Sequence, residues 1–280
     1  MGISGGGAYL GPQEVRYLFV DGGYLRKVAE KFSREFFDGA DLPINYQALG
    51  SQFTRCFYYD CLPAQSANGE SVTNDARLER QREQLSEIRS LHGWHVVEGV
   101  MAGTGNRARQ KQVDVHIAVD LLTHSYRKNM HRAAFIAGDQ DFKPLVEAVV
   151  RDGMLIEIWF ERSSASRDLL DAADGRKPLD LYEFYRYLER PFKDAHPLPK
   201  RWVNESWRVM AGELQRSGEC REGSVDLYCH GGEYTIVGPS QGGGGRYRCM
   251  GYDNLDLLER VFASQFGEIT WRKAPVAPTG

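Results

Sequence analysis

The stretch that decides the fold is Ala134-Phe135-Ile136-Ala137-Gly138-Asp139-Gln140-Asp141-Phe142. Its first four residues are apolar, which is typical of a strand buried on both faces of a parallel sheet. Two aspartates follow the glycine, and a predicted helix then runs over Phe142–Arg151. As ordinary helix-start residues, Asp139 would cap this helix and Asp141 would complement its dipole. A strand that ends in acids and leads into a helix predicts a βα unit.

Further apolar runs and helical stretches alternate along the chain. The other predicted strands are Arg16–Val20, Thr54–Asp60, Trp94–Val100 and Leu155–Phe160. The other predicted helices are Tyr24–Phe32, Asp75–Leu91, Val113–Tyr126, Ser166–Ala173 and Leu179–Leu188. Alternation of this kind predicts an α/β fold with a mostly parallel sheet between helices.

The chain divides into four predicted parts. Residues 1–14 are glycine-rich and are expected to be a flexible N-terminus, and residues 15–190 form the α/β domain. Residues 191–200 contain three prolines and predict a linker. Residues 201–280 predict a small α+β domain, with Gly242–Gly245 as a flexible loop. Its expected elements are a helix (Val203–Arg216), strands (Val225–His230, Tyr234–Val237, Tyr247–Met250), a helix (Leu255–Phe266) and a last strand (Ile269–Arg272).

Composition sets wide limits on function. The 280 residues are 42% hydrophobic and 26% charged, which excludes wholesale disorder. A formal charge of −3 gives no global basic field that would attract nucleic acid. No apolar run is long enough for a membrane span, and the N-terminus lacks the pattern of a secretory signal. Five cysteines without a regular framework indicate free thiols, so we expect a cytoplasmic protein.

Aspartates occupy costly positions in two other segments. Asp21 ends the apolar run Tyr17–Val20 and precedes two glycines, where it could also be a simple turn residue. Asp114 and Asp120 lie in a predicted helix so rich in valine and leucine that we expect it to be largely buried. An unpaired carboxylate is expensive to bury. The alternative is that Asp114 is an N-terminal helix charge and Asp120 faces solvent.

These carboxylates are expected to converge. Strand ends in an open α/β sheet deliver their residues to one edge, where ligands bind. Four or five carboxylates without matching cations would repel one another, but they suit Mg²⁺ or Mn²⁺, which prefer oxygen ligands. Such a site favours metal-assisted hydrolysis of a phosphodiester.

The set Val20-Asp21-Gly22, Lys111-x-x-Asp114 with Asp120, and Gly138-Asp139-x-Asp141-Phe142 resembles the NYN domain, in its LabA-like branch. This family lies within the PIN-like nuclease superfamily, and the resemblance covers roughly residues 16–160. It implies a Rossmann-like sheet and a metal-dependent ribonuclease. By matching position, Asp21, Asp114, Asp139 and Asp141 would be catalytic and hold the metal, with Asp120 as an outer or second-metal acid. The chain departs from many relatives at Tyr24, where they have Asn, and at Ala137, where they have Ser.

The flexible segment before the acidic helix is basic. Arg107, Arg109 and Lys111 could hold an RNA backbone, or the segment could be a solvated surface loop. Tyr24 could stack on a base. His116 is expected to make a structural hydrogen bond, and the cysteine spacing does not fit a structural zinc site.

Three functions remain open from the sequence: an endoribonuclease, a non-catalytic RNA-binding or regulatory module, and a DNA-directed nuclease. A phosphatase of the haloacid dehalogenase type is disfavoured, because Asp21 is followed by two glycines. The expected partner is RNA, single-stranded or structured. Residues 201–280 could bind RNA, self-associate or bind a protein.

Overall fold

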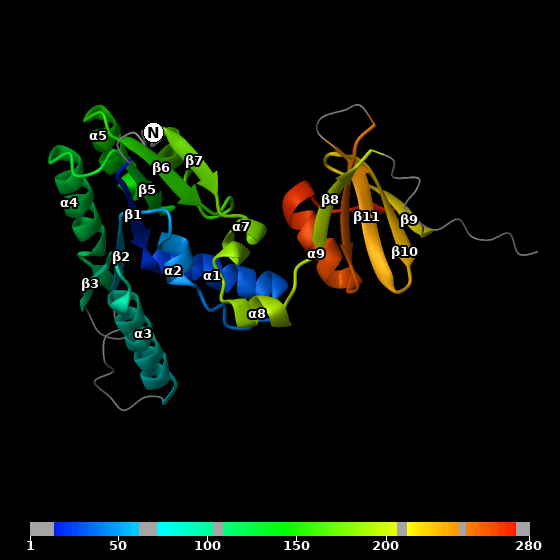
Figure 1. The fold of residues 1–280 in the computed structure, drawn as a ribbon, viewed down its shortest axis with the longest axis horizontal. Helices are drawn as coiled ribbons and strands as arrows, with labels where there is room; N and C mark the ends of the chain where they lie inside the picture. The colour runs from blue at the N-terminus through cyan, green and yellow to red at the C-terminus, as the bar shows by residue number, and fades with distance from the viewer. Residues whose placement is uncertain (1–13, 62–71, 103–108, 206–211, 241–244, 273–280) are drawn as a thin grey trace, which may run out of the picture. The chain divides into compact units, whose positions relative to one another are not determined.

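The computed structural model describes residues 14–61, 72–102, 109–205, 212–240 and 245–272, with the side chains of residues 72–77 and 100–111 left undescribed. The chain forms two compact units. The first comprises Met1–Glu30 with Ile44–Leu188, and the second comprises Lys31–Pro43 with Glu189–Gly280. Both units are shown in Figure 1.

The first unit is built on a seven-stranded sheet in the order β4-β3-β2-β1-β5-β6-β7. Every neighbouring pair is parallel except β3 and β4. The strands are β1 (Arg16–Asp21), β2 (Arg55–Cys61), β3 (Trp94–Ala102), β4 (Arg109–Lys111), β5 (Arg132–Ile136), β6 (Leu155–Phe160) and β7 (Gly175–Pro178). The five predicted strands and the α/β fold with a mostly parallel sheet are therefore confirmed.

Helices cover both faces of this sheet (Figure 1). On one face, α4 and α5 pack on alternate residues such as Phe19, Phe57 and Phe135, in a continuous apolar core. The other face carries Leu18, Val20 and Tyr58, against α1 and α2. The helices are α1 (Gly22–Phe36), α2 (Tyr46–Gly50), α3 (Val72–Ser90), α4 (Val113–Tyr126), η2 (Gln140–Phe142), α5 (Lys143–Arg151), α6 (Arg167–Asp171) and α7 (Leu181–Arg186).

Helix α4 is less buried than its composition predicts. Ile117 and Leu121 are buried in the core, but Val115 and Val119 on the opposite side are 62% and 55% exposed. The prediction of a largely buried helix is therefore wrong for the described part of the chain. The physical reason is that α4 covers the sheet with one face only.

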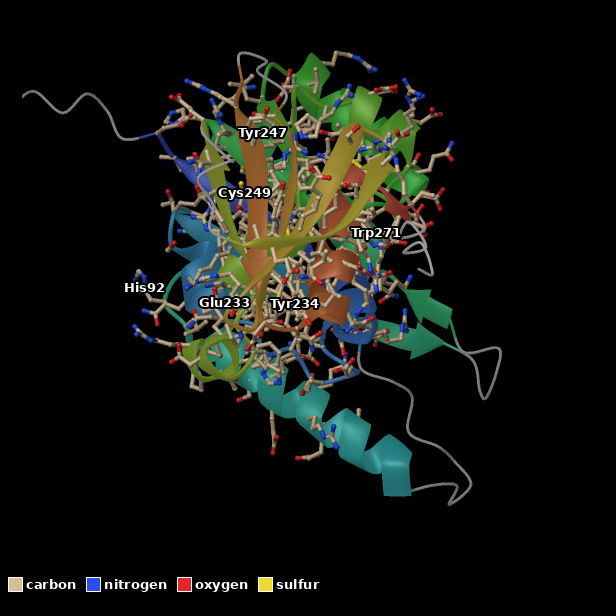
Figure 2. All side chains as sticks on the ribbon, turned by 90° about the vertical axis from the view of Figure 1, so that its right-hand side faces the viewer. His92, Glu233, Tyr234, Tyr247, Cys249 and Trp271 are labelled. Carbon is tan, nitrogen blue, oxygen red and sulfur yellow. The ribbon has the colours of Figure 1, made fainter. Side chains whose placement is uncertain are left out.

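The second unit is a six-stranded antiparallel sheet in the order β13-β9-β10-β11-β12-β8. Helix α9 packs against β11 and β12, and Leu258, Val261 and Phe262 fill the core between them. Figure 2 looks onto this sheet, with Tyr247 and Cys249 marking β12. The elements are α8 (Arg190–Ala195), β8 (Lys200–Asn204), β9 (Glu213–Cys220), β10 (Gly223–His230), β11 (Glu233–Pro239), β12 (Tyr247–Tyr252), α9 (Leu255–Phe266) and β13 (Thr270–Trp271).

Two predictions for this region are wrong. The expected helix Val203–Arg216 is replaced by the end of β8 and the start of β9, which pair with β12 and β10. The expected linker 191–200 contains helix α8, with Pro191 in its first turn, and the first residue of β8. Proline at a helix start fits because its missing N–H has no intrahelical partner there. The other predicted elements of the region are present, and the predicted loop Gly242–Gly245 lies outside the described residues except for Gly245.

No helix in the described ranges is both long enough and apolar enough to cross a membrane.

Candidate active site at the carboxyl edge of the parallel sheet

Asp21 and Asp139 lie at the point where the strand order reverses. Asp21 is the last residue of β1, and Asp139 follows the neighbouring strand β5 after Ala137 and Gly138. The chain leaves β1 toward β2 on one side and leaves β5 toward β6 on the other. In open α/β sheets this switch point is where ligands bind. The fold therefore brings two of the predicted site residues to its expected ligand position.

Both aspartates also begin helices. Oδ1 of Asp21 accepts a hydrogen bond from the Tyr24 N–H at 3.0 Å, at the start of α1. Oδ1 of Asp139 accepts from the Asp141 N–H at 3.0 Å, at the start of η2. These bonds fix both carboxylates with one oxygen each. The second oxygen of each has no hydrogen bond within the described residues and remains available for a ligand.

Tyr24, at the start of α1, contacts both the loop that follows β5 and the loop that follows β6. Its hydroxyl accepts a hydrogen bond from the Glu161 N–H at 2.9 Å and lies 3.1 Å from Oγ of Ser164. Its ring lies so close to Gly138 that a Cβ there would be 2.3 Å from ring carbon Cε2. Position 138 therefore requires glycine. Tyr24 is only 7% exposed, so the prediction that it stacks on a base is wrong, and its role is to position the loops.

Asp114 approaches from the first turn of α4. The helix follows Gln112, whose φ of 76° is in the left-handed region and turns the chain sharply after β4. Asp114 is exposed rather than buried among the valines, which fits the alternative of an N-terminal helix charge. Partial burial of the carboxyl, followed by repulsion from Asp139 and Asp141, raises its pKa. Asp114 is therefore close enough to Asp139 and to Asp141 to be repelled by both.

Asp21 is the most strongly perturbed carboxyl of the site. Burial raises its pKa from 3.8 to about 6, and repulsion from Asp114 and Asp60 adds to this effect. The hydrogen bond from Tyr24 and the charge of Lys27 oppose the rise. Mutual repulsion links Asp21 to Asp114, and Asp114 to Asp139 and Asp141. Four of the five predicted carboxylates thus form one electrostatically coupled group.

Asp120 interacts elsewhere. Its Oδ2 accepts a hydrogen bond from the Tyr59 hydroxyl at 2.9 Å. Burial raises the pKa of Tyr59, and repulsion from Asp120 raises it further, so the hydroxyl keeps its proton. The charge of Asp120 also acts on His124, one turn along α4. The structure therefore does not add Asp120 to the coupled group.

Two acids at the same edge of the sheet were missed in the sequence. Asp60 lies near the end of β2, and Glu161 directly follows β6. They are 0% and 6% exposed. Each ends an apolar run, as Asp21 does, so the same signal could have found them.

Both missed acids are satisfied within the protein. Asp60 receives two hydrogen bonds from the Arg26 guanidinium, at 2.7 and 3.1 Å, and one from the Gln81 amide at 2.9 Å. Glu161 accepts bonds from the N–H and hydroxyl of Ser163. We therefore regard them as structural acids that border the coupled group.

The chemistry of the coupled group suits a hard divalent cation. It offers only carboxylate oxygens, and a cation would offset the burial and the mutual repulsion that together raise the pKa values of Asp21 and Asp114. Within the described ranges, however, no three side chains of His, Cys, Asp or Glu are close enough together to hold a metal ion. The donors fit Mg²⁺ or Mn²⁺ in kind, and they would need to draw closer to bind one.

The predicted RNA-contact residues in the basic segment cannot be located. Arg107 lies outside the described residues. Arg109 and Lys111 belong to β4, which pairs with β3, but their side chains are not described. The backbone nevertheless places them directly before α4, whose first turn carries Asp114.

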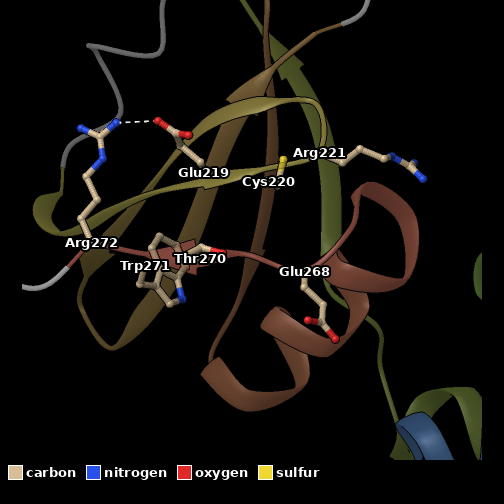
Figure 3. Close-up of a pocket in the computed structure, with 7 residues that line it drawn as sticks. All are labelled: Glu219, Cys220, Arg221, Glu268, Thr270, Trp271 and Arg272. Atoms are coloured by element: carbon tan, nitrogen blue, oxygen red, sulfur yellow. Dashed lines mark hydrogen bonds and ion pairs between the residues drawn. The ribbon is translucent and has the colours of Figure 1, made fainter.

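A separate concave feature lies within the second unit (Figure 3). It is an open pocket of about 510 Å³ beside Trp271. Its charged residues include Arg272 and Glu219, which form an ion pair at 2.7 Å. None of the predicted carboxylates lines it.

Comparison with known families settles the broad classification. The model of the NYN domain matches residues 17–180, from β1 through the whole parallel sheet. The chain belongs to the NYN domain family. This family lies within the PIN-like nuclease superfamily, which confirms the resemblance at family level. The match contains Asp21, Asp114, Asp139 and Asp141.

Other comparisons are more distant. No curated protein is significantly similar to the chain. Among solved structures, a protein of unknown function from Vibrio parahaemolyticus is similar, with 16% sequence identity and a TM-score of 0.42. The similarity covers 63% of this chain and 96% of the other.

Proposed function

We propose that this protein is a Mg²⁺- or Mn²⁺-dependent endoribonuclease of the LabA-like NYN branch. The observation that carries the proposal is the position of Asp21 and Asp139 on adjacent parallel strands at the switch point, within a coupled group of four carboxylates. Membership of a family in the PIN-like nuclease superfamily supports it.

Asp21, Asp114, Asp139 and Asp141 would hold the cation and form the catalytic group. A bound cation would orient and activate water and neutralise charge on the phosphate oxygens. The pKa of Asp21 is about 6, so this carboxyl is largely ionised at neutral pH and available as a ligand. Tyr24 keeps the Asp21 and Asp139 loops in register through its packing on Gly138.

Arg107, Arg109 and Lys111 are the proposed contacts to the RNA backbone. They directly precede α4 in the sequence, and the first turn of this helix carries Asp114. Cations at this position would attract phosphates toward the carboxylate-bound metal. The five cysteines are free, which supports a reducing compartment, and we propose the cytoplasm.

The experiment is a cleavage assay with single-stranded RNA, structured RNA and single-stranded DNA, in Mn²⁺ or in excess EDTA. We expect internal cleavage of RNA in Mn²⁺ and none in EDTA. Asp139→Asn should abolish cleavage without unfolding the protein, because asparagine keeps the acceptor for the Asp141 N–H. Asp194→Asn is the matched control, since Asp194 lies in the second unit with a 70% exposed side chain. Full activity of Asp139→Asn, or of the wild type in EDTA, would refute the proposal.

A non-catalytic RNA-binding module is the second candidate. The observation that favours it is that no preassembled group of three metal ligands occurs among the described residues. It predicts RNA binding that EDTA does not change, with no cleavage of any RNA. Preferential cleavage of DNA in the same assay would instead indicate a DNA-directed nuclease.

A further inference from the structure

Helix α4 has two apolar faces, and the described residues bury one of them and leave most of the other exposed. Val113, Ile117 and Leu121 are buried against the sheet. The opposite face carries a second apolar row, which we call the α4 outer stripe: Val115, Val119, Leu122 and Tyr126. A helix that is apolar all round is normally covered all round.

The exposure of this stripe is unusual within the molecule. Val115, Val119 and Tyr126 are 62%, 55% and 63% exposed, whereas Leu122 is half-buried and its inner side packs against the core. Across the described ranges, three of the six exposed large hydrophobic residues belong to this one helix. They extend for about 16 Å along it, which is a continuous patch rather than scattered single residues.

The spacing of the stripe matches a second copy of itself. Its residues are separated by steps of four, three and four, which is the spacing of a coiled-coil seam. The order of these steps is the same from either end of the stripe, and the midpoint of the stripe lies between Asp120 and Leu121. In an antiparallel pair related by a two-fold axis, Val119 would therefore meet Leu122 of the other copy, and Val115 would meet Tyr126. A partner of unrelated sequence would not require this symmetry.

The charges around the stripe agree with self-pairing. In an antiparallel pair each flank of a helix lies beside the same flank of the other copy, so a charged flank would meet its like. The flanks here carry Ala118 on one side and His116 and Thr123 on the other, with no permanent charge. Antiparallel packing also brings Arg127, at the basic end of α4, to the level of Asp114 in the other copy.

We propose that the α4 outer stripe is a homodimer interface, in which two copies of this chain pair α4 with α4 in antiparallel orientation. The interface is small, so we expect reversible association at micromolar concentrations rather than an obligate dimer. Each acidic N-terminus of α4 would then lie beside Arg127, at the C-terminal end of its partner's helix. The proposal does not depend on nuclease activity.

The test is the oligomeric state of the full chain, measured by sedimentation equilibrium over a concentration series. We expect the wild type to dimerise and Val119→Glu to weaken association at least about tenfold, because two glutamates would lie close to the two-fold axis. Val203→Glu is the matched control: Val203 is 61% exposed on β8, in the second unit, and should leave association unchanged.

A charge exchange tests the symmetry and excludes a folding defect. Val119→Lys should also be monomeric, and mixing it with Val119→Glu should restore dimers that contain one copy of each. A wild type that stays monomeric at all concentrations would refute the proposal. So would a dimer that Val119→Glu does not weaken, or two variants that fail to associate when mixed although each is folded by circular dichroism. If another segment of the same chain covers the stripe, Val119→Glu will lower thermal stability without any change of mass, and the proposal is then also wrong.

Discussion

Replacing Asp21 by asparagine measures how much the ionised carboxylate at the switch point lowers the free energy of unfolding. Burial, followed by the charges of Asp114 and Asp60, raises the pKa of Asp21 from 3.8 to about 6. Since each pKa unit corresponds to about 1.4 kcal/mol, ionised Asp21 destabilises the fold by about 3 kcal/mol above pH 6. Asparagine carries no charge and still accepts the Tyr24 N–H. We therefore expect Asp21→Asn to stabilise the metal-free protein by about 1–3 kcal/mol at pH 8.

The stability difference between Asp21→Asn and the wild type should depend on pH. The folded state binds the Asp21 proton more tightly than the unfolded chain does. The resulting stability is complete below pH 3.8 and is lost as the pH rises through about 6. The advantage of Asp21→Asn over the wild type should therefore shrink to about a third of its pH 8 value near pH 4.5.

The assay is urea unfolding of both proteins in EDTA at about pH 4.5 and at pH 8, with Asp194→Asn as the exposed control. Excess Mn²⁺ should reverse the order, because a ligand that binds only the folded wild type stabilises it. A variant less stable than the wild type at pH 8, or an advantage equal at both pH values, would refute the reasoning.

Two further substitutions test how the site is held. Gly138→Ala would place its Cβ 2.3 Å from the Tyr24 ring, and we expect a loss of about 1–3 kcal/mol in thermal unfolding together with weaker Mn²⁺ binding; unchanged stability would contradict the tight packing. Arg26→Met would leave Asp60, which is 0% exposed, without its two guanidinium bonds. We expect a loss of about 3–5 kcal/mol in urea unfolding, and a loss below about 1 kcal/mol would show that the ion pair is dispensable.

The parallel sheet could be predicted because its signals are local. Each strand is a short apolar run, and the acids that end two of the runs, Asp21 and Asp139, lie at its carboxyl edge. Asp60 and Glu161 carry the same signal, but sequence alone does not show that Arg26 and Ser163 satisfy them. Such partners come from distant parts of the chain.

Other features depended on tertiary pairing. Residues 203–216 have apolar residues at helical spacing, but their neighbours across the sheet, such as Arg248 opposite Val203, draw the described residues into strands. The ring of Tyr24 looks available for stacking until Gly138 and Ser164 are placed beside it. The valines of α4 predicted a largely buried helix, but the sheet covers only one face of it, so Val115 and Val119 are exposed.

The acids along the carboxyl edge of the sheet also bear on how a cation would affect the binding of a phosphate. Asp60 and Glu161 are held permanently by internal partners on either side of the pair formed by Asp21 and Asp139. The electrostatic potential around Asp21 and Asp139 is therefore negative in the absence of a ligand. A phosphate that approached this part of the sheet edge without a cation would be repelled. A divalent cation bound there would offset two of these negative charges and would weaken the repulsion of a phosphate. On the proposed function, these carboxylates would hold the cation, and a bound cation would make it easier for a phosphate of the nucleic acid to approach the sheet edge.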